Sequence, residues 1–153
     1  MSARTPTLSN PANILLVDDN ANGLAARKSV LHELGHRITT ASCGATALEL
    51  LEAHTFDLVV TDYKMPRMDG LELIGRLRKQ APQLPIILIS GYTGALGLNE
   101  ESTGADAVLE KSANEVSHLV RAVNRLLRRK PVAKKPPGSK PSSVSAKNKR
   151  KSG

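Results

Sequence analysis

Cysteine and aromatic residues are scarce in this sequence. The 153 residues include one cysteine, Cys43, two tyrosines, one phenylalanine and no tryptophan. One cysteine cannot close a disulfide within the chain, which excludes a disulfide-stapled fold and fits a reducing compartment. We expect Cys43 to be structural. The shortage of rings gives no support to a nucleic-acid surface built on base stacking.

Hydrophobic runs are short throughout the chain. None approaches the roughly 20 apolar residues that a membrane-spanning helix needs. The N-terminal stretch MSARTPTLSNPAN also lacks the apolar segment of a secretory signal. The sequence therefore predicts a soluble cytoplasmic protein without a membrane span.

Acidic residues are missing from the C-terminal stretch. The chain has 22 Lys+Arg and 14 Asp+Glu, a net charge of +8, and residues 130–153 hold eight of the basic residues and no acidic one. Setting these eight aside leaves 14 basic against 14 acidic residues in 1–129. The basic character therefore belongs to a tail and not to the expected folded part.

Composition divides the chain into three parts. Residues 1–12 are polar with two prolines, and we expect them to be disordered. Residues 13–130 carry the apolar pattern of one domain. Residues 131–153 have few apolar side chains, so burial cannot offset the entropy of ordering them, and we expect disorder. Two interpretations of this tail stay open: a solubilising extension, or nonspecific attachment to nucleic acid or another anionic partner.

Short apolar runs alternate along the chain with stretches of helical spacing. One of these runs, 37–41, is more polar than the others, which is typical of a strand at a sheet edge. The alternation predicts a parallel sheet with helices on both faces. We expect strands at 13–17, 37–41, 57–61, 85–90 and 107–109.

Local signals mark several of the expected helices. Asp69 is placed to cap the helix that follows the third strand. The glycine-rich stretch 91–103 predicts a short or mobile helix, because interior glycine costs a helix roughly 0.5–1 kcal/mol relative to alanine. Ser112 and Glu115 have the spacing of a capping box for the last helix, which Pro131 would stop.

Polar side chains follow four of the expected strands. Asp18 and Asp19 come after the first, Asp62 after the third, Ser90 after the fourth and Lys111 after the fifth. The carboxyl ends of parallel strands meet at one edge of a sheet, where such folds bind ligands. Each residue alone could be a turn or loop residue, but their joint placement favours a site.

Three carboxylates at one edge repel one another unless a positive charge lies between them. Mg²⁺ suits a few carboxylates together with water ligands, and Lys111 supplies a further cation. Such a pocket stabilises a dianionic phosphoryl group. Asp62 could then act as a nucleophile, with Ser90 donating a hydrogen bond to a phosphoryl oxygen.

Four stretches carry a resemblance to a known family: LLVDD at 15–19, LVVTDYKMPRMDG at 58–70, PIILISGY at 85–92 and LEK at 109–111. In this order they resemble the receiver domain of two-component response regulators, from Asn13 to about Arg129. The D-x-x-M-P-x-M-D-G loop is close to diagnostic alone. The resemblance implies a flavodoxin-like doubly wound (βα)5 sandwich with a parallel sheet of order 2-1-3-4-5.

The resemblance also implies a metal site. It identifies Asp18 and Asp19 as the acidic metal pair of a Mg²⁺ site, which Asp62 and the backbone carbonyl of Lys64 complete. No other cofactor is implied.

The resemblance further implies a phosphoryl-transfer role. Asp62 is identified as the phosphoacceptor, Ser90 as the switch hydroxyl and Lys111 as the phosphate-binding lysine. The donor would be a phosphohistidine on a sensor histidine kinase or a phosphotransfer protein. The chain would catalyse only its own phosphorylation and dephosphorylation and would not be an enzyme in the usual sense.

Two positions depart from the family pattern. Ser112 stands where family members usually have a proline after a cis peptide bond, and a cis bond before a residue other than proline costs roughly 2.5–4 kcal/mol. We therefore expect a trans Lys111–Ser112 bond. Val108 stands where the family usually has its switching aromatic residue, so the resemblance does not extend to that part of the switch.

Two alternatives remain beside a stand-alone receiver whose output is binding to an unknown downstream protein. A haloacid-dehalogenase-like phosphatase also uses aspartate, lysine and Mg²⁺, but it normally has a D-x-D motif after the first strand, where this chain has Asp18, Asp19 and Asn20. A degenerate receiver would bind its partner regardless of phosphate.

Overall fold

The computed structural model describes residues 11–91 and 97–128. The expectations for residues 1–10, for the central part of the glycine-rich stretch and for the C-terminal tail lie outside these ranges. Ala12, which we expected to precede the fold, lies in the described part and is buried. Its carbonyl accepts a hydrogen bond from the Arg37 backbone.

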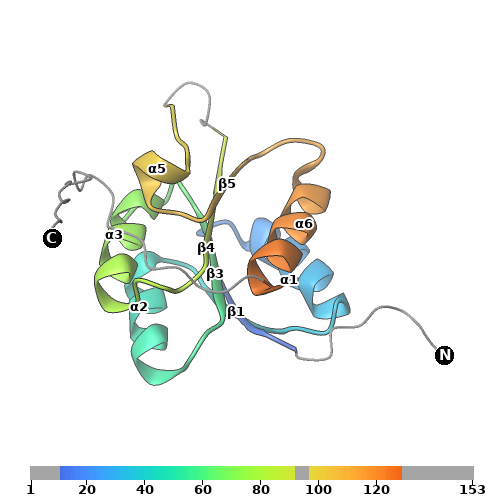
Figure 1. Ribbon diagram of the computed structural model, residues 1–153, viewed down its shortest axis with the longest axis horizontal. Coiled ribbons are helices and arrows are strands. Elements are labelled where there is room, and N and C mark those ends of the chain that lie inside the picture. Colours follow the sequence, from blue (N-terminus) through green and yellow to red (C-terminus); the bar gives the residue numbers. More distant parts are fainter. Residues whose placement is uncertain (1–10, 92–96, 129–153) are drawn as a thin grey trace, which may run out of the picture.

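Five parallel strands form one sheet at the centre of the molecule (Figure 1). The strand order β2-β1-β3-β4-β5 confirms the flavodoxin-like arrangement implied by the resemblance. All five expected strands are present, each within about one residue of its expected ends. Their bounds are β1 (Asn13–Val17), β2 (Arg37–Ala41), β3 (Leu58–Asp62), β4 (Ile86–Ser90) and β5 (Ala107–Glu110).

Burial explains the apolar runs of the central strands. Every residue of β3 and β4 is buried, because helices cover both faces of the sheet. In β2 only Ala41 is buried, and this strand lies at an edge as its polar sequence predicted. The centre of the sheet is therefore shielded from water. Polar residues lie at the carboxyl ends of β1, β3 and β4.

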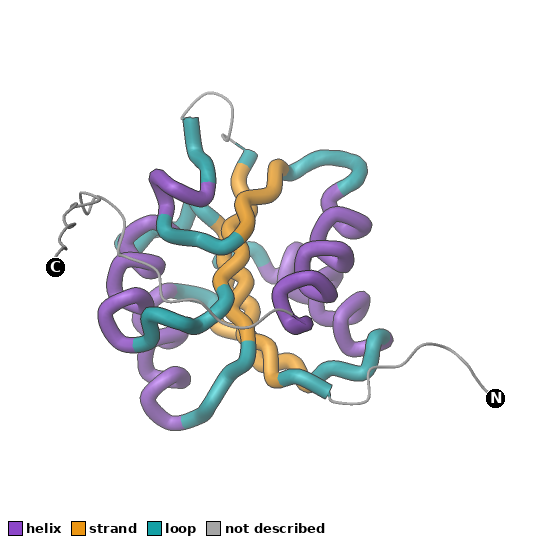
Figure 2. Tube along the Cα trace, in the orientation of Figure 1, coloured by secondary structure: helices purple, strands orange, loops and turns teal. Residues whose placement is uncertain are grey.

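Helices cover both faces of the sheet, as Figures 1 and 2 show. The helices α1 (Ala21–Glu33) and α6 (Glu115–Arg128) pack on one face, and α2 (Gly44–Ala53), α3 (Gly70–Gln80) and the short α5 (Glu100–Thr103) lie on the other. Successive strand residues point to opposite faces. Leu15 accordingly belongs to the core under α2 and α3, and Leu16 to the core under α1 and α6.

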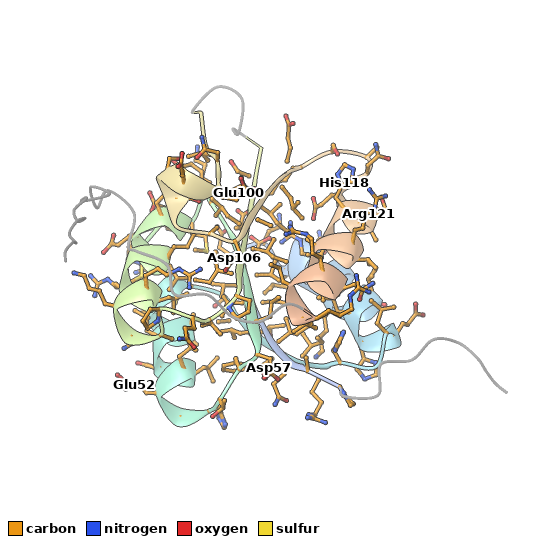
Figure 3. The ribbon with its side chains drawn as sticks, in the orientation of Figure 1. Glu52, Asp57, Glu100, Asp106, His118 and Arg121 are labelled. Carbon is orange, nitrogen blue, oxygen red and sulfur yellow. The ribbon has the colours of Figure 1, made fainter. Side chains whose placement is uncertain are left out.

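Charged side chains lie mainly outside these layers (Figure 3). Glu52 on α2 and His118 and Arg121 on α6 are exposed. Asp106, labelled near the centre of the same view, is buried and is paired with Arg78. Buried charges of this kind are costly unless they are paired, so their partners matter for both stability and function.

One expected helix cap is confirmed and another is wrong. Asp69 caps α3 by accepting a hydrogen bond from the Glu72 backbone at 2.9 Å. The expected capping box of Ser112 and Glu115 does not form, because α6 begins at Glu115 itself. Ser112 Oγ accepts from the Asn114 backbone at 3.2 Å. The Glu115 carboxylate instead pairs with the buried guanidinium of Arg27, which is a stronger partner than a backbone N–H group.

The chain enters this last segment without a cis bond. None of the described residues has a cis peptide bond, so the Lys111–Ser112 bond is trans, as expected.

Candidate functional site

Three carboxylates meet at the carboxyl ends of β1 and β3. Asp18 and Asp62 are buried and Asp19 is exposed, and one carboxylate oxygen from each lies within 4.8 Å of the others. Because β1 and β3 are hydrogen-bonded neighbours, the register that pairs Val17 with Thr61 brings the following aspartates together. The convergence expected from the strand ends is therefore present.

Asp62 lies in a dry position with a cation beside it. Lys111 Nζ is 2.8 Å from Asp62 Oδ1, and the lysine side chain is 41% exposed, so it reaches the carboxylate from the surface. Burial raises the pKa of Asp62; the Lys111 hydrogen bond opposes this, and the charge of Asp18 adds to it. The carboxylate is thus less stable in its charged form than it would be in water, which favours binding of a further cation.

The loop after β3 is closed tightly against Asp62. The Gly70 backbone donates a hydrogen bond to the Tyr63 carbonyl at 2.7 Å. A Cβ atom at Gly70 would lie 2.5 Å from the backbone oxygen of Asp62, so only glycine fits where α3 begins. Lys64 lies in this loop, two residues beyond Asp62, with an exposed side chain.

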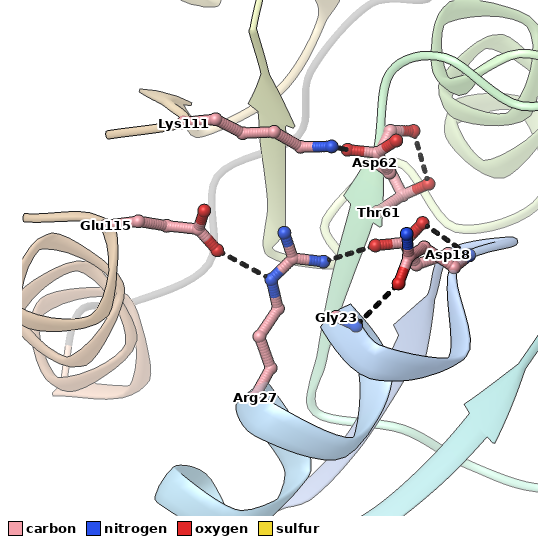
Figure 4. A network of polar contacts seen from close by, with 8 residues as sticks. Asp18, Gly23, Arg27, Thr61, Asp62, Lys111 and Glu115 are labelled. Carbon is pink, nitrogen blue, oxygen red and sulfur yellow. Dashed lines mark hydrogen bonds and ion pairs between the residues drawn. The ribbon is translucent and has the colours of Figure 1, made fainter. Parts of the chain in front are cut away.

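Asp18 is held by two donors (Figure 4). Its Oδ1 accepts from the Asn20 backbone at 3.0 Å, and its Oδ2 accepts from Arg27 Nη1 at 2.7 Å. Arg27 Nε donates to Glu115 at 2.8 Å. Burial lowers the pKa of Arg27, but the hydrogen bonds and charges of Glu115 and Asp18 outweigh this and raise it, so the guanidinium stays charged.

Ser90 and Lys111 lie on neighbouring strand ends. Ser90 is the last residue of β4 and is buried, and its backbone oxygen accepts from the Lys111 backbone at 3.0 Å. Ser90 therefore ends its strand at the same edge of the sheet as the three carboxylates. The structure thus places the predicted side chains of Asp18, Asp19, Asp62, Ser90 and Lys111 on one edge.

Sequence reasoning missed Arg27 and assigned Glu115 to a helix cap instead of to this arginine. Arg27 lies on the stripe formed by Leu24, Leu31 and Leu34, at a core-facing position of α1. An arginine in the middle of an apolar stripe was the available signal, because a buried cation needs an acidic partner. Nothing in the local sequence identifies that partner, since Glu115 is 88 residues away.

The donor set suits a hard divalent cation. Carboxylate oxygens are the ligands that Mg²⁺ prefers, and crowding of three carboxylates is relieved when a cation binds. The Lys111 ammonium adds a cation on the same side as Asp62. The fold and this pocket define an α/β protein with a cluster of carboxylates at the edge of a parallel sheet, and this cluster fits a divalent cation.

Comparison with known proteins identifies the family. The family model described as the response regulator receiver domain matches residues 14–124. The chain belongs to this family, and its pocket of Asp18, Asp19 and Asp62 fits a phosphoacceptor site. The haloacid-dehalogenase-like alternative receives no support, because the receiver model spans the whole pocket.

Individual relatives agree with this assignment. The response regulator receiver protein CpdR of Brucella abortus (strain 2308) is 33% identical over 115 residues, covering 74% of this chain and 95% of CpdR. A gliding motility regulatory protein of Myxococcus xanthus is 34% identical over 119 residues, covering 74% of this chain and 15% of that protein. The match covers only 8–18% of the length of seven curated relatives, the Myxococcus xanthus protein among them.

A solved structure shows the same fold. The response regulator TrrA of Thermotoga maritima, in complex with Mg(2+)-BeF, is 36% identical with a TM-score of 0.69, and the match covers 75% of this chain and 98% of TrrA. Receiver domains bind Mg²⁺ and take phosphate from sensor histidine kinases, and they are not enzymes of the usual kind. Within residues 11–91 and 97–128, no helix is long and apolar enough to cross a membrane.

Proposed function

We propose that this chain accepts a phosphoryl group on Asp62 from a phosphohistidine of a sensor histidine kinase or a phosphotransfer protein. One observation carries the proposal: Asp62 is a buried carboxylate between a second buried carboxylate, Asp18, and the Lys111 ammonium at 2.8 Å. Lys111 balances only part of the negative charge of these carboxylates, so the pocket favours a further cation, which would in turn attract a dianionic phosphoryl group.

Each residue has a distinct task in the proposed reaction. Asp62 attacks phosphorus through a carboxylate oxygen. The new O–P bond forms as the N–P bond of the phosphohistidine breaks. The imidazole of the donor protein takes up a proton and leaves as a neutral ring. Lys111 neutralises charge on the phosphoryl oxygens. Ser90 donates its hydroxyl to one of those oxygens, since it ends β4 beside Lys111.

The acidic pocket would hold the Mg²⁺ ion. Asp18, Asp19 and Asp62 would supply carboxylate ligands, and Lys64 would supply its backbone carbonyl. When bound, Mg²⁺ supplies positive charge for the transferring phosphoryl group.

The wider function follows from this chemistry. The chain acts in the cytoplasm, it turns over its own phosphoryl group and no other substrate, and its output is binding to a downstream protein. Its basic C-terminal residues give additional nonspecific contact with nucleic acid or another polyanion.

Intact mass spectrometry tests the proposal. The wild-type chain is incubated with acetyl phosphate or phosphoramidate in the presence and absence of Mg²⁺. We expect one added phosphoryl group per chain, only when Mg²⁺ is present. Asp62→Ala is expected to abolish the adduct. Asp57→Asn is the matched control, because Asp57 precedes the same strand at its opposite end, and we expect it to keep the adduct.

Other outcomes would identify the alternatives. No adduct in any protein would indicate a receiver that binds its partner regardless of phosphate. Steady release of phosphate without an adduct would indicate a phosphatase. An adduct that survives in Asp62→Ala would move the phosphoacceptor to another residue.

A further inference from the structure

A buried arginine joins the acidic pocket to the last helix. The Arg27 side chain on α1 is 7% exposed and contacts two carboxylates through different nitrogens, Asp18 at 2.7 Å and Glu115 at 2.8 Å (Figure 4). Asp18 is one of the three members of the carboxylate pocket, and Glu115 is the first residue of α6. A single guanidinium therefore links the metal-binding edge of the sheet to a helix on its surface.

Arg27 donates to a carboxylate oxygen of Asp18 that a metal ion would need as a ligand. Asp18 Oδ2 accepts from Arg27, and Asp18 Oδ1 accepts from the Asn20 backbone. A charge-assisted bond from a buried guanidinium is among the strongest that a carboxylate makes. The remaining lone pairs of Asp18 are less available and less negative than those of a free carboxylate.

The helix backbone leaves room for this pair. A Cβ atom at Gly23 would lie 2.8 Å from Asp18 Oδ2 and 3.7 Å from Arg27 Nη1. Gly23 lies inside α1, where glycine lowers helix stability relative to alanine. A side chain at Gly23 would therefore press on the Arg27–Asp18 contact.

We propose that Arg27 is a built-in competitor of the divalent cation: it neutralises Asp18 in the metal-free protein and must give up that contact when the pocket is loaded. This inference rests on the proposed function, because it takes Mg²⁺ as the ligand of the pocket. A divalent cation bound to Asp18 would repel the Arg27 guanidinium that lies 2.7 Å from Oδ2 of the same carboxylate, so each contact weakens the other.

The same contact couples the pocket to α6. Metal loading removes one of the two anchors of Arg27, and the first turn of α6 loses its tie to β1 through Asp18. By linkage, anything that strengthens the bridge weakens Mg²⁺ binding, and Mg²⁺ weakens the bridge by the same factor.

Mg²⁺ titration by calorimetry, without any phosphoryl donor, tests the competition. We expect Arg27→Met to bind Mg²⁺ at least about fivefold more tightly than the wild type, within the usual range of coupling between sites. Lys28→Met is the matched control, because it removes the same charge from the neighbouring exposed position of α1. It is expected to change the affinity by less than about twofold, since exposed charges are screened. Equal or weaker binding by Arg27→Met would overturn the competition.

Hydrogen exchange tests the coupling to α6. In the wild type, Mg²⁺ is expected to speed exchange of the first turn of α6 and to leave α2, on the opposite face of the sheet, unchanged. Glu115→Ala keeps Asp18 and Arg27 but removes the second anchor, so this response to Mg²⁺ should disappear. This variant tests the coupling between the pocket and α6 even if Arg27→Met does not fold. A first turn of α6 that ignores Mg²⁺ in the wild type would contradict the coupling.

These results separate the inference from the proposed function. A chain that forms the Asp62 adduct while Arg27→Met binds Mg²⁺ like the wild type keeps the function and loses the inference. A chain that binds no Mg²⁺ in either form, and forms no adduct, loses both.

Discussion

His36 carries a buried imidazole whose two nitrogens have different surroundings. Its Nδ1 accepts a hydrogen bond from the Ala12 backbone at 3.0 Å, which requires the neutral ring with its proton on Nε2. A second proton would have to sit on Nδ1, facing the Ala12 N–H group. Burial lowers the pKa of His36, and the charge of Asp57 only partly opposes this.

The free energy of unfolding should therefore depend on pH through this residue. The folded-state pKa of His36 lies below its ordinary value of 6.5, so the unfolded chain takes up the proton first as the pH falls. The contribution of His36 to the free energy of unfolding is complete above pH 6.5. It declines as the pH falls from 6.5 towards the lower folded-state pKa.

Urea unfolding at a series of pH values checks this expectation. His36→Asn, which keeps an acceptor near the position of Nδ1 but does not titrate, should flatten the decline. His118→Asn, at an exposed site on α6, should keep it. A decline of the same size in His36→Asn would show that other groups cause it.

At the scale of elements, a buried ion pair joins the end of α3 to the loop before β5. Arg78 has no exposed side-chain surface and donates to Asp106 at 2.8 Å, to the Gly104 carbonyl at 2.8 Å and to the Leu84 carbonyl at 2.6 Å. Asp106 also accepts from the Ile86 backbone at 2.9 Å. The pair thereby ties the end of α3 to the start of β4 and to the loop before β5.

Removal of the arginine should be costly. Arg78→Ala removes the guanidinium from Asp106 and from the buried carbonyls of Gly104 and Leu84, and we expect a loss of about 3–5 kcal/mol in the free energy of unfolding. Arg76→Ala is the control two residues away on the same helix, because its pair with Glu72 is exposed. It should cost less than about 1 kcal/mol. Denaturant unfolding of both variants measures the difference, and similar losses would contradict the role of Arg78.

At the scale of the whole molecule, charge is divided between two parts of the chain. Residues 1–129 have 14 basic and 14 acidic residues, whereas residues 130–153 carry eight basic residues and no acidic ones. A polyanion would therefore be attracted mainly by the C-terminal residues. Clustered lysines release condensed counterions from nucleic acid, which gives binding that depends steeply on salt and little on sequence.

Truncation tests this division. Removal of residues 131–153 should abolish retention of the protein on DNA at low salt, whereas the full chain should be retained and then released between roughly 50 and 200 mM salt. Phosphorylation of Asp62 by a small-molecule donor should be unchanged in the truncated chain. Unaltered retention of the truncated chain would contradict a binding role for the tail.

The sequence by itself determined the strands and the polar residues that follow them. The apolar runs before Asp18, Asp62 and Ser90 predicted buried strands, and parallel strands necessarily bring their carboxyl ends to one edge. This reasoning located the acidic pocket because it needed only local signals and one property of the sheet. The resemblance to receiver domains added the strand order, which local signals do not determine.

Only the tertiary structure decided which partner each buried charge finds. Glu115 has the spacing of a capping residue, yet it pairs with Arg27, because α1 and α6 pack on the same face of the sheet and bring a buried guanidinium to it. Arg78 likewise meets Asp106 across 28 residues. The physical reason is common to both: a desolvated charge takes the strongest partner that packing brings within reach, and sequence spacing does not encode that distance.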